Sequence, residues 1–207
     1  MSAEVALTFD TEHPDGPDCP PDSPSRILDV LAEADVRASF FVQGRWASAY
    51  PALARRIATD GHLVGNHSHA HANLTQLTPA GLAEEVCRAE EAIRWSTGVD
   101  PRPWFRCPYG THSHGEALVP TLRRLGYRDA HWNVTPEDWD PELTAAELTD
   151  RIVDGVVARD GVAVVLLHSW PAVVPHALPD AVEALQRKGF RFTTVDELPE
   201  DSSWLRA

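Results

Sequence analysis

The sequence predicts an α/β fold with a mostly parallel sheet. Short β-rich runs alternate with amphipathic helical stretches along the chain, and the connections between them are short. Such alternation is typical of βαβ units, which place their strands in parallel. Two predicted strands, VALTF from residue 5 and VAVVLL from residue 162, are almost continuously apolar, as expected where helices cover both faces of a sheet. An open doubly wound sheet and a small closed barrel both fit this pattern.

The expected elements follow one another in regular order. Strands are predicted at residues 5–10, 38–43, 63–66, 104–106, 129–134, 162–168 and 190–195, and helices at 24–34, 46–58, 78–95, 116–125, 143–158 and 179–188. Pro24 suits a first helical turn, with Ser23 and Ser25 as candidate caps. Thr144 and Glu147 have the spacing of a capping box. With 207 residues and no linker or repeat, residues 1–207 are expected to form a single domain.

The charge and the terminal sequence narrow the class of protein. The chain carries 31 acidic against 18 basic side chains, a net charge of −13, which repels nucleic acid backbones and anionic membranes. No apolar run has the length of a membrane span. The first residues, MSAEVALTFD, lack the basic and apolar regions of a secretory signal, and three sparse cysteines fit reduced thiols. We therefore expect a cytoplasmic protein with neither nucleic acid nor membrane as a partner.

Polar side chains of catalytic type occur where four of the predicted strands end. Asp10 ends the first strand, His67 follows the third, Arg106 ends the fourth and His168 ends the sixth. In parallel α/β folds, ligands bind at the carboxyl ends of strands. Core packing alone does not produce this pattern, so the sequence predicts a functional site at this edge of the sheet.

His67 and His71 form the strongest local signal. On a helical turn, imidazoles four residues apart lie on one face and can bind one cation. A polar surface turn is the alternative, and the spacing by itself does not decide between them. The position directly after an apolar strand favours a ligand pair, with His69 pointing elsewhere.

Two carboxylates, Asp10 and Glu12, follow the first strand. A buried strand end is a costly place for them unless they are paired, hydrogen-bonded or bound to metal. One of them could complete a site of two histidines and a carboxylate, and the other could act as a base on metal-activated water. The alternative is a capping role for one of them in the loop that follows.

Three further segments fit a catalytic site when taken together. Arg106 could hold a catalytic carboxylate ionised and in place. Asp138 could orient and charge a histidine, and Trp139 beside it offers a flat face to a sugar ring. His168, at the mouth of an apolar strand, is suited to general acid or base chemistry. Each of these residues by itself has an ordinary structural explanation. They indicate a catalytic site only because they occur together.

Five short motifs, in their order along the chain, resemble those of the polysaccharide deacetylase family, which is carbohydrate esterase family four with its nodulation-deacetylase homology domain. They are Thr8-Phe9-Asp10, His67-Ser68-x-x-His71, Arg106-x-Pro108-Tyr109, Asp138-Trp139 and Leu166-Leu167-His168. The resemblance covers nearly the whole chain. It implies one catalytic domain over residues 1–207, folded as a distorted (β/α) barrel with about seven parallel strands.

The resemblance also implies a role for each motif residue. Asp10 would be the general base, oriented by Arg106, and His67 and His71 would bind a divalent ion, usually zinc. Asp138 would tune His168, the general acid that protonates the departing amine. The backbone N–H of Tyr109 would help hold the oxyanion, and Trp139 and Leu166 would wall the pocket for the acetyl methyl. The reaction implied is hydrolysis of an N-acetyl or O-acetyl group on a carbohydrate or small amidosugar.

One position departs from the family pattern. The first motif of the family usually ends in a second Asp that binds the metal, whereas this chain has Thr11, whose neutral hydroxyl is a poor ligand. Glu12 is the nearest replacement, and His13 is a second candidate. With this departure the chain also resembles relatives that act on small intracellular amides or cyclic ureides.

Two other functions stay open at this point. One is a non-catalytic carbohydrate-binding relative that lost its metal with the change at residue 11. The other is an intracellular amidase acting on a small linear or cyclic amide, possibly without a metal. Specificity is expected to depend on the loops 13–24 and 111–116, whose composition does not name a substrate.

Overall fold

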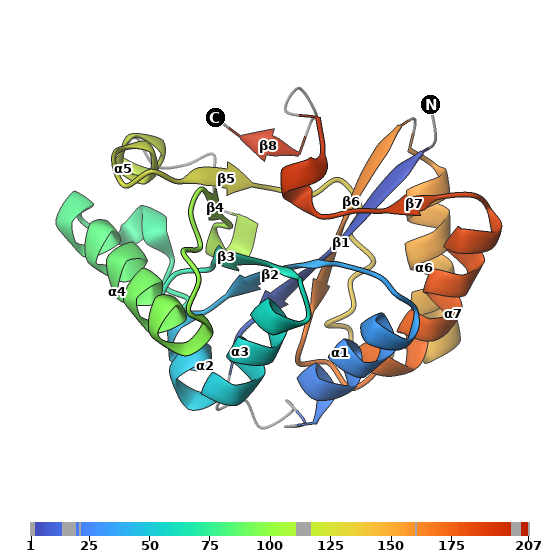
Figure 1. Cartoon of the computed structure of the whole chain (residues 1–207). Helices are drawn as coiled ribbons and strands as arrows, with labels where there is room; N and C mark the ends of the chain where they lie inside the picture. The colour runs from blue at the N-terminus through green and yellow to red at the C-terminus, as the bar shows by residue number, and fades with distance from the viewer. Residues whose placement is uncertain are drawn as a thin grey trace.

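One curled sheet organises the chain. The computed structural model describes residues 3–13, 20, 22–110, 117–159, 161–199 and 204–206. The sheet order is β6-β1-β2-β3-β4-β5-β8, and β7 pairs with the start of β1 (Figure 1). Every pairing is parallel except that of β5 with β8. The strands are β1 (Glu4–Thr11), β2 (Ser39–Val42), β3 (Leu63–Asn66), β4 (Trp104–Phe105), β5 (Arg128–Ala130), β6 (Val162–His168), β7 (Arg191–Phe192) and β8 (Leu205–Arg206).

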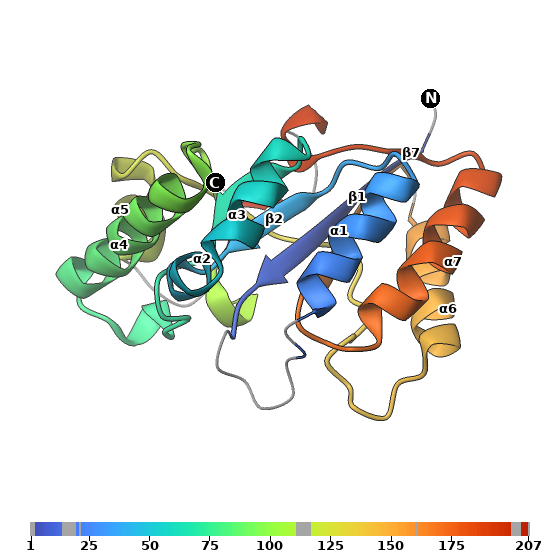
Figure 2. The ribbon, with the colours of Figure 1, turned by 60° about the horizontal axis from the view of Figure 1, so that its bottom comes forward.

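Helices cover the outer face of this sheet. Figure 2 brings α1, α2, α3 and α7 to the front, where they lie over the strands, and Figure 1 shows α6 and α7 side by side at one end. The helices are α1 (Ser23–Glu33), α2 (Gly44–Ala49), α3 (Pro51–Thr59), α4 (Pro79–Thr97), α5 (Leu118–Arg124), α6 (Ala145–Val157) and α7 (Val174–Arg187), with short 3₁₀ turns at Leu74–Gln76, Pro108–Gly110 and Val195–Glu197.

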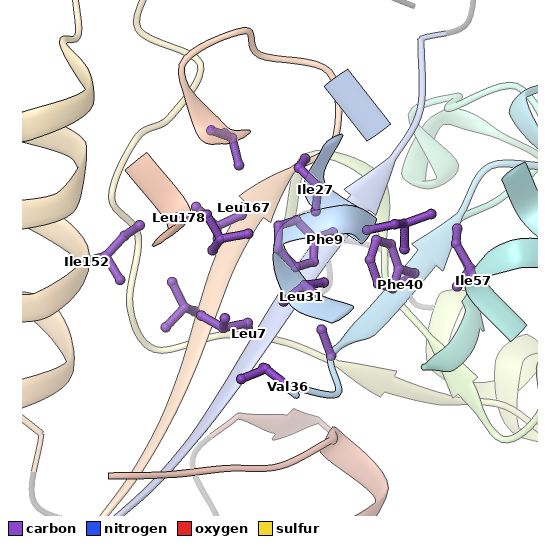
Figure 3. Close-up of a cluster of buried hydrophobic side chains, with 14 of the residues drawn as sticks. Leu7, Phe9, Ile27, Leu31, Val36, Phe40, Ile57, Ile152, Leu167 and Leu178 are labelled. Atoms are coloured by element: carbon purple, nitrogen blue, oxygen red, sulfur yellow. The ribbon is translucent and has the colours of Figure 1, made fainter. Parts of the chain in front are cut away.

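The largest core lies between the sheet and these helices. Phe9 of β1 stacks on Phe40 of β2 with 4.9 Å between ring centroids. Both rings face Ile27 and Leu31 of α1 (Figure 3), and all four side chains are buried. Each such side chain contributes about 1.5–3 kcal/mol by leaving water. This packing holds β1 between β6 and β2 and so fixes where its carboxyl end lies.

The sheet closes on itself beyond β5. Val134 forms an isolated parallel bridge with Val165 of β6, so the chain that leaves one side of the sheet returns to the other. A second apolar cluster, which includes Phe41, Trp104 and Trp204, packs against the inner face of the curl. The distorted (β/α) barrel that the sequence analysis expected is therefore confirmed.

Several local expectations were wrong in detail. The single helix expected at 46–58 is two helices, because Pro51 begins a new one. The last helix starts at Val174 rather than at Pro179, which lies inside it. Its buried apolar face offsets the hydrogen bond that an internal proline removes. The short antiparallel strand β8 was not expected at all.

Of the predicted helix caps, the one at α6 is confirmed and the one at α1 is wrong. Thr144 and Glu147 form the expected capping box. Ser23 and Ser25 do not cap α1, whose N-cap residue is Asp22. Ser23 instead donates its hydroxyl to the Pro171 carbonyl, and Ser25 donates to the Asp22 carbonyl.

Among the described residues, no helix combines the length and the apolar character needed to cross a membrane. Cys87 is exposed and Cys107 is buried, and neither is in a disulfide within the described residues; Cys19 lies outside them.

A buried histidine lies just before β3, at the opposite edge of the sheet. The His62 ring is 7% exposed, and its Nδ1 accepts the backbone N–H of Ala38 at 3.2 Å. Burial is the main reason that the pKa of His62 is lowered to about 4. A proton on Nδ1 would also remove the acceptor for Ala38.

We expect His62 to make the folded protein less stable as the pH falls from about 6.5 to about 4. In this window the unfolded chain takes up a proton that the folded chain does not bind, which costs about 3 kcal/mol of stability at the acid end. Chemical denaturation of wild type and His62→Asn across this range would measure it. Asn keeps an acceptor near the Nδ1 position but does not titrate, so the variant should lose this part of the pH dependence. An unchanged slope would contradict the assignment.

Candidate functional site

The carboxyl edge of the barrel gathers most of the side chains that the sequence singled out. Asp10 and His168 are Cα partners in the pairing of β1 with β6, so both side chains lie on the inner face of the sheet. His67 directly follows β3, and Arg106 directly follows β4. The remaining predicted residues lie on the loops that follow β1, β3, β4, β5 and on β6: Glu12, His71, Tyr109, Asp138, Trp139 and Leu166.

A buried ion pair crosses the inside of the barrel. Arg106, 1% exposed, donates from Nη1 to Asp10 Oδ1 at 2.9 Å and to Thr8 Oγ1 at 2.8 Å. Its Nε and Nη2 donate to the carbonyls of Ala130 and His131. The guanidinium also lies 4.0 Å from the centroid of the Phe41 ring. Because every side of the cation is engaged, Asp10 is held in one orientation.

His67 presents one definite nitrogen to the site. Its Nδ1 lies 2.8 Å from the carbonyl oxygen of Arg106, which can only accept, so Nδ1 carries the proton. In the neutral form of the ring the Nε2 lone pair is free, 3.2 Å from Glu12 Oε2 and 3.6 Å from Asp10 Oδ2. A hydrogen bond of this kind commonly orients a histidine that binds metal.

The segment between His67 and His71 is not helical, contrary to expectation. Ser68 and His71 have positive φ angles of 61° and 56°. Asn66 Oδ1 accepts the backbone N–H of Ser68, and Ser68 Oγ accepts that of His71. Side-chain bonds of this kind compete with helical ones. The two imidazoles still meet, with 5.0 Å between ring centroids.

Glu12 lies between the histidines and is 3% exposed. Its Oε2 is 2.6 Å from His71 Nε2 and 3.2 Å from His67 Nε2, and its Oε1 is 3.0 Å from His13 Nε2. Burial by itself raises the pKa of Glu12, but its close contacts with the ring nitrogens of His13, His67 and His71 outweigh burial and hold the pKa well below its usual range. Glu12 is therefore an anion in the folded protein.

The donor set fits a divalent metal ion. Glu12 Oε2 and His67 Nε2 are both buried and close, yet neither makes a well-oriented hydrogen bond within the described residues. Close atoms without well-oriented hydrogen bonds are expected where the ligand atoms point toward a common ion and not toward one another. Two or three imidazoles and one carboxylate are a ligand set that zinc and similar ions accept.

The structure brings His13 into this set as well as the predicted ligands. Ligand atoms of Glu12, His13 and His71 all lie within 4.8 Å of one another. His67 lies outside that grouping, although its Nε2 is 3.2 Å from the same carboxylate. Both histidines therefore lie within reach of an ion bound by Glu12. They differ in order, because the His67 ring is buried whereas the His13 side chain is 42% exposed.

His168 is paired with Asp138 as the sequence predicted. Asp138 Oδ1 is 2.8 Å from His168 Nδ1, and its Oδ2 accepts the backbone N–H of His168 at 2.6 Å. Burial alone lowers the pKa of His168, but the charge and hydrogen bond of Asp138 outweigh it and raise the pKa to about 9. The ring is therefore a cation at neutral pH, with its Nε2 turned toward the Glu12 side of the site at 3.9 Å.

Aromatic rings flank His168 on two sides. The centroids of Trp139 and Trp170 lie 5.5 Å and 5.6 Å from that of the imidazole. Both indoles, with Asp138, line a hollow of about 460 Å³. Leu166 does not line it; this side chain is buried on the same face of β6 as His168. Tyr109 is exposed, and its ring lies 4.5 Å from that of His71.

Sequence reasoning missed two contributors to the site. Thr8 had been seen only as part of a motif, but its hydroxyl holds Arg106; its position two residues before Asp10, on the same strand face, was the available signal. Trp170 is the second contributor, and no local sequence signal indicates that it contacts Glu12. The loop at 111–116 lies outside the described residues, as does most of the loop at 13–24.

A buried base candidate, a metal donor set and a charged histidine at the mouth of a β/α barrel define a metal-dependent hydrolase. Comparison with known proteins identifies its family. Residues 2–130 match the family model described as "Polysaccharide deacetylase". The chain is 36% identical to a chitooligosaccharide deacetylase of Bradyrhizobium, over 94% of this chain and 90% of that protein. The chain belongs to the polysaccharide deacetylase family, carbohydrate esterase family four, and is a deacetylase that hydrolyses carbon–nitrogen bonds other than peptide bonds.

Solved structures share its fold. A family 4 carbohydrate esterase from Streptomyces lividans, in complex with acetate, superposes with a TM-score of 0.78 at 29% identity over 91% of this chain and 90% of that one. A family 4 pseudoenzyme from Bacillus anthracis gives 0.83 at 26% identity over 95% of this chain and 65% of that one. Likeness of fold therefore does not by itself establish turnover, which depends on the residues of the site.

We expect Asp138→Asn to lower the pKa of His168 from about 9 toward its ordinary value near 6.5, because the largest favourable charge is lost. An NMR titration of the imidazole Cε1–H in metal-free protein would measure it. Asp140→Asn, two residues further on the same turn, is the matched control and should leave the pKa near 9. A His168 pKa that stays near 9 in Asp138→Asn would show that Asp138 is not its cause.

Proposed function

We propose that this protein removes the N-acetyl group from an amino-sugar unit of a short acetylated oligosaccharide, with zinc as its metal ion. The observation that carries the proposal is that three separate groups of residues lie together at one edge of the barrel. These are the Asp10–Arg106 pair, the Glu12–histidine donor set and the Asp138–His168 pair. A binding module needs none of them in these charge states.

The proposed zinc ligands are Glu12, His67 and His71, with His13 within reach. Nitrogen donors from imidazoles and one carboxylate oxygen suit zinc better than magnesium or calcium, which prefer all-oxygen sites. When bound, the ion supplies Lewis acidity, which lowers the pKa of water and polarises the acetyl carbonyl. Three protein ligands leave room for water and substrate, as catalytic zinc sites require.

Asp10 is the proposed base. Arg106 holds its Oδ1, and its Oδ2 faces the donor set, 3.6 Å from His67 Nε2. A proton taken from the attacking water would therefore reside on Oδ2, while the guanidinium keeps the carboxylate oriented. Arg106 acts through Asp10 and does not itself face the substrate, because all its bonds point into the barrel.

His168 is the proposed acid. Asp138 keeps the ring protonated and fixes its orientation, so Nε2–H can be delivered to the amine as the carbon–nitrogen bond breaks. Water adds to the acetyl carbon, the amine leaves with the proton from His168, and acetate is the second product. Trp139 and Leu166 are the proposed walls for the acetyl methyl, and the Tyr109 backbone N–H a donor to the oxyanion.

The names of two relatives support this substrate class. The Bradyrhizobium protein is named for chitooligosaccharides, and a Bacillus cereus relative that is 31% identical is named for the N-acetylglucosamine of peptidoglycan. The Trp139 and Trp170 faces beside His168 suit stacking on a sugar ring. A cytoplasmic location, which would favour soluble oligosaccharides over wall polymer, stays a prediction.

Metal analysis separates this proposal from the other two functions. We expect about one equivalent of zinc or a similar ion per chain in protein purified without added metal, and loss of deacetylation after chelation that returns with zinc. Acetate release from N-acetylglucosamine oligomers is the assay. Protein without metal would favour the binding-module alternative, and full activity after chelation on a small amide would favour the metal-independent amidase.

Substitution of the proposed base and acid tests the mechanism. We expect Asp10→Asn and His168→Ala each to lower kcat by roughly 10²–10⁴, the range of general acid–base catalysis. Zinc content should stay near that of wild type, because neither side chain is a proposed ligand. Asp150→Asn, on helix α6, is a control for loss of a carboxylate.

Folding must be checked for Asp10→Asn, since Arg106 keeps its buried charge without its partner and stability falls. Circular dichroism at the assay temperature, together with a thermal denaturation curve, provides that check. His168→Ala tests the mechanism without removing the partner of Arg106. Near-wild-type turnover in folded Asp10→Asn would show that Asp10 is not the base.

A further inference from the structure

The two carboxylate oxygens of Glu12 have different partners. Oε2 faces the Nε2 atoms of His71 and His67, at 2.6 and 3.2 Å. Oε1 points the other way and accepts the indole N–H of Trp170 at 3.3 Å, with His13 Nε2 at 3.0 Å. The carboxylate is therefore shared between a face that can bind metal and a face that is held by the protein.

Such a hold matters more for this chain than for one with an aspartate at residue 11. Glu has one more rotatable bond than Asp, and ordering it costs side-chain entropy that a metal ligand must recover on binding. Thr11 is a poor ligand, and among the described residues the carboxylate that lies nearest the histidine pair is the longer one, Glu12. A donor that fixes Glu12 before the ion arrives would remove part of that cost.

Trp170 is well placed to be this donor. The backbone N–H of Ser169 donates to the Asp10 carbonyl at 3.0 Å, so the pairing of β6 with β1 continues beyond His168 and anchors the residue that follows. The Trp170 ring packs against His168 on one side and His13 on another, with centroids 5.6 and 6.0 Å apart. These contacts aim the indole N–H back toward the carboxylate.

We propose that Trp170 is a positioning residue of the metal centre, which holds Oε1 of Glu12 so that Oε2 faces the ion. The inference rests on the proposed function only in that Glu12 is taken as a metal ligand. An indole N–H can donate but cannot bind metal or lose its proton at ordinary pH. It therefore stays on Oε1 whether or not the ion is present.

His13 acts on the same oxygen but is a weaker candidate for the permanent hold. Its side chain is 42% exposed, and its nitrogen can also bind metal, so it can leave Oε1 when the ion binds. Trp139, the other indole beside His168, lies at 5.5 Å from that ring and is 43% exposed. It offers a matched control, because it shares the packing on His168 without a bond to Glu12.

The test compares the zinc dissociation constants of wild type, Trp170→Phe and Trp139→Phe by competition with a chromogenic chelator. Phe keeps an aromatic ring and removes only the donor. We expect a rise of about 10-fold in Trp170→Phe, the lower end for loss of a partner that orients a metal ligand, and less than about twofold in Trp139→Phe. The visible spectrum of the cobalt-substituted protein should shift in Trp170→Phe alone. Equal affinities and spectra in the two variants would overturn the proposal.

A double-mutant cycle separates positioning from a merely structural role. If Trp170 acts through Glu12, then Trp170→Phe made in Glu12→Ala protein should change zinc affinity by less than about twofold. A 10-fold loss that persists without Glu12 would overturn the proposal, since the indole would then act by another route.

A measurement on folded protein avoids dependence on the Trp170 variant. In ¹⁵N-labelled protein without metal, Glu12→Ala should move the indole N–H resonance of Trp170 and leave that of Trp139 in place. An unmoved Trp170 resonance would contradict the bond. Absence of zinc binding in wild type would instead overturn the metal centre itself, so the failure of this inference and the failure of the proposed function give different results.

Discussion

The site depends first on the buried contact between Arg106 and Asp10. A guanidinium inside a barrel is tolerated only when its N–H groups are engaged, and here Thr8, Asp10 and two carbonyls at the end of β5 engage them. Those carbonyls belong to the stretch that leads back to β6 and closes the curl. One cation thus ties together β1, β4 and β5 and orients the proposed base. Loss of either charge would leave the other buried and unpaired, at a cost of roughly 3–5 kcal/mol.

The same arrangement orients the rest of the site through the backbone. The carbonyl oxygen of Arg106 accepts a hydrogen bond from His67 Nδ1–H. The residue that orients Asp10 therefore also sets the tautomer of a candidate metal donor. Pairing of β1 with β6 places His168 beside Asp10, and Asp138 then charges that ring. The proposed base thus lies beside a guanidinium, and the proposed acid lies beside a carboxylate.

Glu12 shows how this chain accommodates a departure from its family. The carboxylate does not occupy the usual position, and its longer side chain reaches the histidine pair from one residue further along. It meets there a set of donors, from His13 and Trp170, that lie on neither of the family motifs containing the histidines or the base. The proposed change of ligand residue is therefore accompanied by contacts from the adjacent His13 and from Trp170, which is distant in the sequence.

The sequence by itself determined the strands, the order of the βα units and the residues at the strand ends, because periodicity and polar interruptions of apolar runs are local signals. Asp10, His67, Arg106 and His168 were identifiable for that reason. Only the tertiary structure decided the curl of the sheet, the strand β8, the non-helical path from His67 to His71 and the contact of Trp170 with Glu12. Each depends on groups far apart in the chain, or on side-chain bonds that compete with helix, and local pattern carries no information about either.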